Sequence, residues 1–258
     1  MSIITGKYKE INDLYKITDY MIENSINDKG NFVANHTWVN SINGKNKIYT
    51  TINDVRISDD IYNIIKLRYP DHKIKNVTDS DEIYFAVSPK DASGSDRSLV
   101  DCHYDAPFSI VPTSNIIFYR VIIACNENKD VTTMFPNDNI GVKMNIGDFH
   151  GLDYNKDYHC ADGEIPKDKH RVLLKLHYIL IPNTYEDNSF SENYVRFINV
   201  QWTYFSREFM RMSAHPNNIM EHLMGFIVNF LRFYYNNTIL LLLLIILTVY
   251  KNKLLKNF

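Results

Sequence analysis

Hydrophobic positions in the first third of the chain follow a helical period. Between residues 8 and 26, apolar side chains recur about every 3.6 residues, which predicts an amphipathic helix. A second, shorter helix is predicted over 58–69, where a serine and two aspartates precede an apolar periodic segment and a proline follows it. Between the two helices, the turn dipeptide Asn43-Gly44 within residues 31–51 predicts a β-hairpin.

From residue 82 onward the pattern changes to short β-prone runs. These runs are rich in branched and aromatic residues and are separated by turn residues, which is typical of an antiparallel sandwich or barrel. Residues 190–212 are predicted as a strand followed by a helix. The expected fold class is mainly β (α+β), with N-terminal helices that support a β-rich core. The predicted strands cover residues 82–87, 99–108, 116–125, 131–135, 141–146 and 171–181.

The C-terminal pattern differs in kind. Residues 238–250 are uncharged and almost wholly apolar, and extending this run back to Leu231 gives about 20 residues, enough to span a bilayer. We therefore expect a transmembrane helix over 231–250, preceded by a juxtamembrane segment at 213–230 and followed by a basic tail at 251–258. A buried C-terminal helix is the alternative, because the strictly apolar part is short.

This organisation predicts a support region at 1–80, a core domain at 81–212 and a single-pass C-terminal anchor in a viral or host-cell membrane. The three cysteines, Cys102, Cys125 and Cys160, form no CxxC pair and are too few for a disulfide framework. We interpret them as core thiols of a domain in the cytosol, a reducing compartment. A formal net charge of -2 gives no general electrostatic attraction to nucleic acid, so a nucleic-acid partner is not indicated, although it is not excluded.

Candidate chemistry lies in the predicted strand 99–108. His103 and Asp105 are two residues apart, so on a strand they would share one face. A second histidine would complete the set of two imidazoles and one carboxylate that leaves open positions on non-haem iron(II). His150 and His159 both follow at a suitable distance, and both are candidates. Because a lone His-x-Asp motif often arises by chance, the surrounding residues decide its weight.

Further residues follow in order after His103-Tyr104-Asp105: 118–123, 132–136, Gly147-Asp148, His159 and Arg171. Together these residues resemble the iron(II)/2-oxoglutarate-dependent oxygenases, particularly the prolyl 4-hydroxylase-like branch. The resemblance implies a double-stranded β-helix, or jelly roll, in which His103, Asp105 and His159 bind Fe(II). It also implies that Arg171 pairs with the far carboxylate of the cosubstrate 2-oxoglutarate, and that the Tyr119 hydroxyl donates to the same carboxylate.

The resemblance covers roughly residues 82–181 and leaves alternatives open. His150 remains a second candidate for the distal ligand, although it would leave Arg171 too far along the chain, and Lys169 could take the role of Arg171. The family's Gly-Gly-Glu-Thr stretch is replaced here by Asp-Val-Thr-Thr at 130–133.

The expected function is that of a membrane-anchored dioxygenase. It would use O₂ and 2-oxoglutarate to hydroxylate a side chain, with proline the first expectation, on a protein or peptide substrate. One alternative is a membrane-anchored jelly-roll protein with an interaction or structural role and no catalysis. Another is a cupin-type metal enzyme that acts without 2-oxoglutarate.

Overall fold

The computed structural model describes residues 2–27, 30–88, 102–105, 115–167, 169–185, 190–214, 219–220 and 222–223. The chain separates into two compact units, residues 1–204 and 205–258. All the residues that the sequence marks as candidates for chemistry lie in the first unit.

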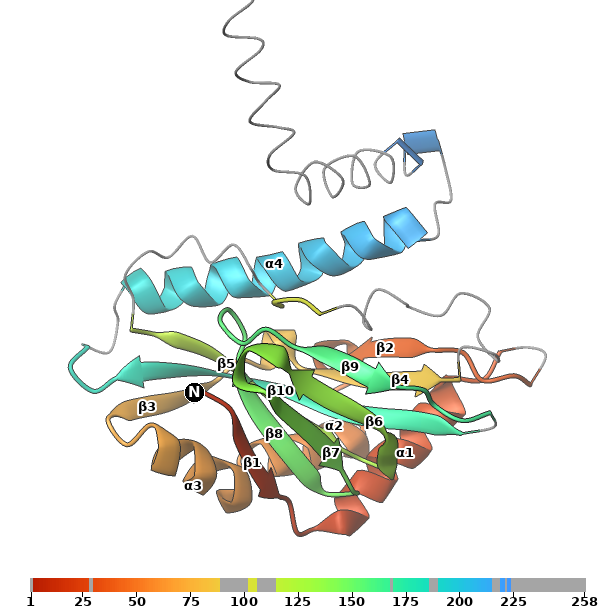
Figure 1. Cartoon of the computed structure of the whole chain (residues 1–258), viewed down its shortest axis with the longest axis horizontal. Coiled ribbons are helices and arrows are strands. Elements are labelled where there is room, and N and C mark those ends of the chain that lie inside the picture. The colour runs from red at the N-terminus through yellow and green to blue at the C-terminus, as the bar shows by residue number, and fades with distance from the viewer. Residues whose placement is uncertain are drawn as a thin grey trace, which may run out of the picture. The chain divides into compact units, whose positions relative to one another are not determined.

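Two antiparallel sheets form the framework of the first unit (Figure 1). The larger sheet has the strand order β1-β8-β5-β10-β4-β2, and β3 pairs with the far end of β10. The smaller sheet has the order β7-β6-β9. The larger sheet comprises β1 (Ile4–Lys7), β2 (Asn35–Trp38), β3 (His72–Asn76), β4 (Glu82–Val87), β5 (Ile117–Ala124), β8 (Asp148–Asp153) and β10 (His170–Pro182). The smaller sheet comprises β6 (Asn128–Phe135), β7 (Ile140–Met144) and β9 (Cys160–Gly163).

Helices α1 (Ile11–Asn24), α2 (Lys47–Arg56) and α3 (Asp59–Arg68) cover one face of the larger sheet (Figure 1). Each helix buries apolar residues spaced three or four apart, as an amphipathic helix must when it packs on a sheet. The core beneath them is almost wholly apolar. Its buried members include Leu14, Ile17, Met21, Ile52, Val55, Ile61, Ile65, Phe85, Val121, Ile123, Val172, Leu174 and Leu176.

The other face of the larger sheet meets the smaller sheet. Ile122, Leu152 and Leu173 from the larger sheet pack against Phe135 and Met144 from the smaller one. Side chains alternate between faces along a strand, so this second face also receives the polar residues of β5, β8 and β10. The space between the two sheets is therefore where buried polar chemistry can be assembled.

Helix α4 (Phe190–Ala214) packs against strands of the larger sheet. Val195 and Val200 on this helix pack with Phe118 of β5 and Ile179 of β10. Sequence analysis predicted a strand followed by a helix in this segment. The helix is confirmed, whereas the predicted strand is wrong because the apolar residues follow the helical period throughout.

The predicted hairpin within residues 31–51 is also wrong. A single strand, β2, is followed by a 3₁₀ turn at Val39–Ser41 and then by α2. The Asn46 side chain caps this helix by accepting a hydrogen bond from the Ile48 amide at 2.9 Å. The Asn43-Gly44 turn therefore leads into a helix, because the apolar residues that follow it have helical spacing.

The two helices predicted at 8–26 and 58–69 are confirmed as α1 and α3, and the predicted strands at 82–87, 116–125 and 171–181 as β4, β5 and β10. The structure adds β8 and β9 in segments for which no strand was predicted. In the predicted strand 99–108, the four residues that are described contain one isolated bridge.

The predicted transmembrane helix at 231–250 lies outside the described residues. None of the helices in the described part of the chain has the length and apolar character that crossing a bilayer requires. The longest of them, α4, carries charged side chains such as Glu192 and Arg196 among its apolar residues. This finding contradicts the single-pass membrane localisation that was expected from the sequence.

Candidate metal centre

The candidate site forms where two segments distant in sequence meet between the sheets. His103 and His159 make an isolated antiparallel bridge, in which each amide donates to the other's carbonyl at 2.8 and 3.0 Å. The bridge places the two imidazoles on the same side of the paired segments, with ring centroids 4.8 Å apart. Asp105 follows two residues after His103, so its carboxylate returns to the same side.

The three side chains offer a compact set of ligand atoms. The Asp105 carboxylate oxygens lie 3.6 Å from Nε2 of His103 and 3.8 Å from Nε2 of His159. All three ligand atoms lie within 4.8 Å of one another. Two ligands of one ion are separated by at most about twice a metal–ligand bond of about 2.0–2.2 Å, so small inward movements suffice to bind one ion. His150 is not a member of this set.

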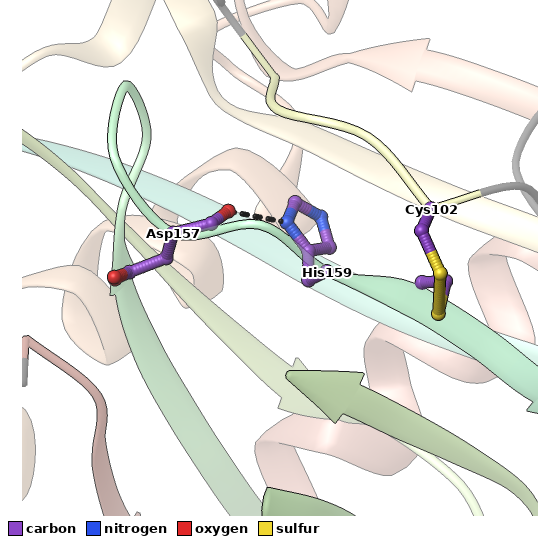
Figure 2. The surroundings of a disulfide bond; sticks show 4 residues. Cys102, Asp157 and His159 are labelled. Atoms are coloured by element: carbon purple, nitrogen blue, oxygen red, sulfur yellow. Dashed lines mark hydrogen bonds between the residues drawn. A yellow bond between two sulfur atoms is a disulfide. The ribbon is translucent and has the colours of Figure 1, made fainter. Parts of the chain in front are cut away.

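His159 is prepared as a neutral ligand. Its Nδ1 lies 3.0 Å from the carbonyl oxygen of Asp157 (Figure 2). A carbonyl only accepts, so Nδ1 carries the hydrogen and the lone pair is left on Nε2, which faces Asp105. Burial lowers the pKa of His159, and the Asp105 carboxylate opposes that effect only in part. The imidazole is therefore uncharged at neutral pH, as metal binding requires.

Asp105 is held ionised by Arg120 on β5. Burial alone would raise the pKa of Asp105, but Arg120, His159 and His103 together hold it well below its usual value. Nη1 of Arg120 donates to Asp105 Oδ2 at 2.6 Å. The Arg120 guanidinium also stacks over the Tyr154 ring, 4.5 Å from its centroid. A carboxylate fixed in this way is charged and oriented before any metal arrives.

A buried chain of hydrogen bonds supports Arg120 in turn. Arg120 and His177 are directly opposite each other on β5 and β10, and Arg120 Nε donates to His177 Nε2 at 2.9 Å. The His177 Nδ1 then carries its hydrogen and faces Asp81 Oδ1 at 3.3 Å, while Arg56 Nε donates to Asp81 Oδ2 at 2.7 Å. Burial and Arg120 lower the pKa of His177 to about 4. Helix α2 is thereby linked to the candidate site.

Arg171 lies in the same interior. It is buried on the face of β10 that meets the smaller sheet, and burial lowers its pKa to about 10, so that it stays charged at neutral pH. His150 of β8 is fully buried between the sheets, and its Nε2 has no hydrogen-bond partner among the described residues. Burial, with smaller contributions from His159 and Arg171, lowers the pKa of His150 to about 3. A buried cation and an unsatisfied ring nitrogen suit an anionic polar ligand.

The two other candidates for the cosubstrate site lie elsewhere. Lys169 is exposed and pairs with Asp130 at 3.2 Å, so the structure does not bring it into the interior. Tyr119 is directly opposite Tyr178 on the helix-covered face of the larger sheet, and its hydroxyl donates to the Ser2 carbonyl at 2.9 Å. The expectation that Tyr119 faces the site is corrected, because neighbouring residues on a strand point to opposite faces and Arg120 takes the inner one.

The interpretation of the cysteines is corrected as well. Cys102 and Cys160 form a disulfide across the bridge, one residue outside each ligand histidine, whereas Cys125 is a buried free thiol. The order Cys-His in one segment and His-Cys in the other was a signal for this pairing, because antiparallel segments place such mirrored neighbours opposite each other.

Sequence reasoning also missed the role of Arg120. The available signal was a lone charged residue inside the apolar strand 116–125. A charge in such a position is retained in a folded core only when it has a partner, so it indicates a buried carboxylate nearby.

No family model and no curated protein matches the chain. Among solved structures, the epimerase SnoN in complex with Fe³⁺, alpha-ketoglutarate and nogalamycin RO is 11% identical, with a TM-score of 0.49 over 71% of this chain and 83% of that chain. The viral collagen prolyl hydroxylase of Paramecium bursaria Chlorella virus-1, as a 2OG complex, is 11% identical, with a TM-score of 0.45 over 70% of this chain and 96% of that chain. A prolyl 4-hydroxylase structure from Phytophthora capsici is 11% identical, with a TM-score of 0.46 over 91% and 81%.

Proposed function

We propose that this protein is an iron(II)- and 2-oxoglutarate-dependent dioxygenase on a double-stranded β-helix. His103, Asp105 and His159 would hold Fe(II), and Arg171 would bind the far carboxylate of 2-oxoglutarate. The observation that carries the proposal is the set of two imidazoles and one ionised carboxylate whose ligand atoms lie within 4.8 Å. These ligands come from distant parts of the chain, so their meeting is not a property of one local motif.

The donor set fits iron better than a structural metal. Two imidazoles and one carboxylate on one side of an ion leave the other side open, whereas structural sites close around their metal. Bound iron with 2-oxoglutarate supplies the oxidising chemistry that acts on an unactivated C–H bond. The protein's own contribution is to keep Asp105 charged through Arg120 and to keep His159 neutral and oriented through the Asp157 carbonyl.

Arg171 supports 2-oxoglutarate as the cosubstrate. A planar guanidinium takes a carboxylate through two parallel hydrogen bonds, and it remains charged when partly desolvated. This buried cation in the interior that contains His150 and His159 favours a dicarboxylate and argues against a cupin-type enzyme without 2-oxoglutarate. The complete ligand set, with its ionised Asp105 carboxylate, argues against a non-catalytic jelly roll. A protein or peptide side chain, with proline the first to test, is proposed as the substrate on the basis of the sequence resemblance.

The test is turnover by the full chain. Purified protein with Fe(II), 2-oxoglutarate and a set of proline-containing peptides should form succinate, and mass spectrometry should find a peptide gain of one oxygen atom. The Asp105→Ala variant should form no succinate above background. Succinate formation at equal rates by the wild type and Asp105→Ala, or by neither, contradicts the proposal. Succinate formation without any peptide oxidation would support 2-oxoglutarate as the cosubstrate and show that the tested peptides are not substrates.

A further inference from the structure

The disulfide between Cys102 and Cys160 lies directly beside both proposed iron ligands of the imidazole type. We propose that this bond is a redox switch that sets the affinity of the site for its metal. The inference rests on the proposed function. It adds that thiol–disulfide exchange with a dithiol reductant regulates metal binding at the site.

Three consecutive cross-strand pairs define the geometry: Cys102 with Cys160, His103 with His159, and Tyr104 with Tyr158. The central pair is His103 and His159, joined by two backbone hydrogen bonds. One residue outward, Cys102 and Cys160 are bonded, with their Cα atoms 4.1 Å apart. In an antiparallel pair, a position next to a hydrogen-bonded pair is a close, non-hydrogen-bonded one, which is where opposite side chains approach most nearly. Figure 2 shows the disulfide at Cys102 close to His159, whose ring is hydrogen-bonded on its other side by Asp157.

The bond couples to metal binding because it joins the two segments that supply the ligands. The segment 102–105 carries two of the three ligands, and 58 positions separate its cysteine from Cys160. A covalent tie at this place removes much of the freedom of one segment relative to the other before metal arrives. Without the tie, that freedom must be lost when His103, Asp105 and His159 gather around the ion, so the affinity falls.

The remaining contacts across the pair are weaker. Beyond the two backbone hydrogen bonds, the described contacts between the segments are the His103–His159 and Tyr104–Tyr158 ring pairs, with centroids 4.8 and 5.0 Å apart, and the approach of His159 Nε2 to the Asp105 carboxylate at 3.8 Å. Each is non-covalent and contributes modestly. The disulfide is thus the one covalent contact between these segments among the described residues.

The bond is also placed for reaction. Cys102 is exposed and Cys160 is half-buried, so a dithiol can reach the sulfur atoms. Its thiolate attacks one sulfur to give a mixed disulfide, and its second thiol then closes the reductant's own disulfide. Two electrons and two protons pass to Cys102 and Cys160, which become thiols. Cys125 takes no part, because it is fully buried and burial raises its pKa to about 12.

The experiment compares metal affinity in the two redox states of the full chain. Wild-type protein is used oxidised, or reduced by a dithiol that is then removed without air, and each form is titrated with Fe(II) anaerobically. We expect reduction to weaken Fe(II) binding at least tenfold and reoxidation to restore it. A Cys102→Ser/Cys160→Ser double variant has neither the bond nor these thiols, so it should bind as weakly as the reduced protein under both treatments. Cys125→Ala should behave like the wild type.

A second measurement needs neither metal nor turnover. Hydrogen exchange in the metal-free protein should show faster exchange of the His103 and His159 amides after reduction, because these amides bond to each other across the pair. Equal Fe(II) affinity and equal exchange in the oxidised, reduced and doubly substituted proteins would contradict the redox switch. If the same proteins still formed succinate, the proposed function would be unaffected. If the oxidised protein binds no Fe(II), the proposed function and the switch both fall.

Discussion

The two faces of the larger sheet have opposite characters, and strand β10 belongs to both. Its residues Leu174 and Leu176 point into the helix-covered core, whereas the alternate residues Arg171, Lys175 and His177 point to the other face. Both sets are buried. One strand therefore stabilises the fold with one face and carries the candidate site on the other, at a period of two residues.

The energetics of the two faces differ accordingly. On the helix-covered face, burial of apolar area is favourable residue by residue. On the other face, each buried charge requires a partner: Lys175 pairs with Glu82 at 3.1 Å, and Arg120 pairs with Asp105 at 2.6 Å. Substitutions on the first face should lower stability and leave binding unchanged, whereas substitutions on the second should change binding first.

The largest effect is expected for metal binding by the polar face. Asp105→Ala should lower Fe(II) affinity by more than about 100-fold, since loss of a direct ligand costs more than loss of an outer-shell partner. Anaerobic calorimetric titration measures this affinity. His150→Ala is the matched control, because His150 is buried in the same interior but is not in the ligand set, and it should retain metal binding. If His150→Ala lost the metal and His159→Ala retained it, the third ligand would be His150 and not His159.

Substitutions on the apolar face should change the stability of the fold and leave Fe(II) affinity unchanged. Leu174 is fully buried in the core beneath the helices. Leu174→Ala should lower the free energy of unfolding by about 2–5 kcal/mol, from lost apolar burial and the cavity that remains. Urea denaturation followed by circular dichroism measures this change. A parallel loss of Fe(II) affinity in the folded variant would show that the two faces are not independent.

Substitutions on the two faces of the larger sheet should differ in their effect on 2-oxoglutarate binding. Arg171→Ala should raise the 2-oxoglutarate dissociation constant at least tenfold, because one charge-assisted pair is lost, a cost of about 2–5 kcal/mol. Tyr119→Phe, on the helix-covered face, and Lys169→Ala, at the surface, should leave the constant unchanged. Equilibrium titration with the metal-loaded protein gives all three values. An effect of Tyr119→Phe as large as that of Arg171→Ala would reverse the assignment of faces.

The smallest effect concerns pH. His177 has its pKa lowered to about 4 in the folded protein, against 6.5 for an ordinary histidine. Between these values the unfolded chain binds a proton that the folded protein does not, so stability is lost as pH falls from about 6.5 to 4. His177→Gln should reduce this slope by up to one proton, about 1.4 kcal/mol per pH unit. Denaturant unfolding of the metal-free protein at several pH values tests this; an unchanged slope would contradict it.

Local patterns accounted for much of the fold. Helices α1 and α3 and strands β4, β5 and β10 were readable because spacing, turn residues and β-branched runs act over short distances. Strand β8 was not predicted from the sequence, because it is its pairing with β1 and β5 that selects the strand. The 31–51 hairpin failed for the related reason that a turn dipeptide does not specify the element that follows it.

Within the candidate site, the sequence alone determined the ligand types and the spacing of His103 and Asp105, since two residues apart on an extended segment lie on one side. Tertiary structure decided that His159 joins them while His150 does not, that Tyr119 faces the helices, and that Cys102 bonds to Cys160. Each of these depends on strand register. A shift of one residue moves every side chain to the opposite face, and register is set by pairing between segments that are distant in the chain.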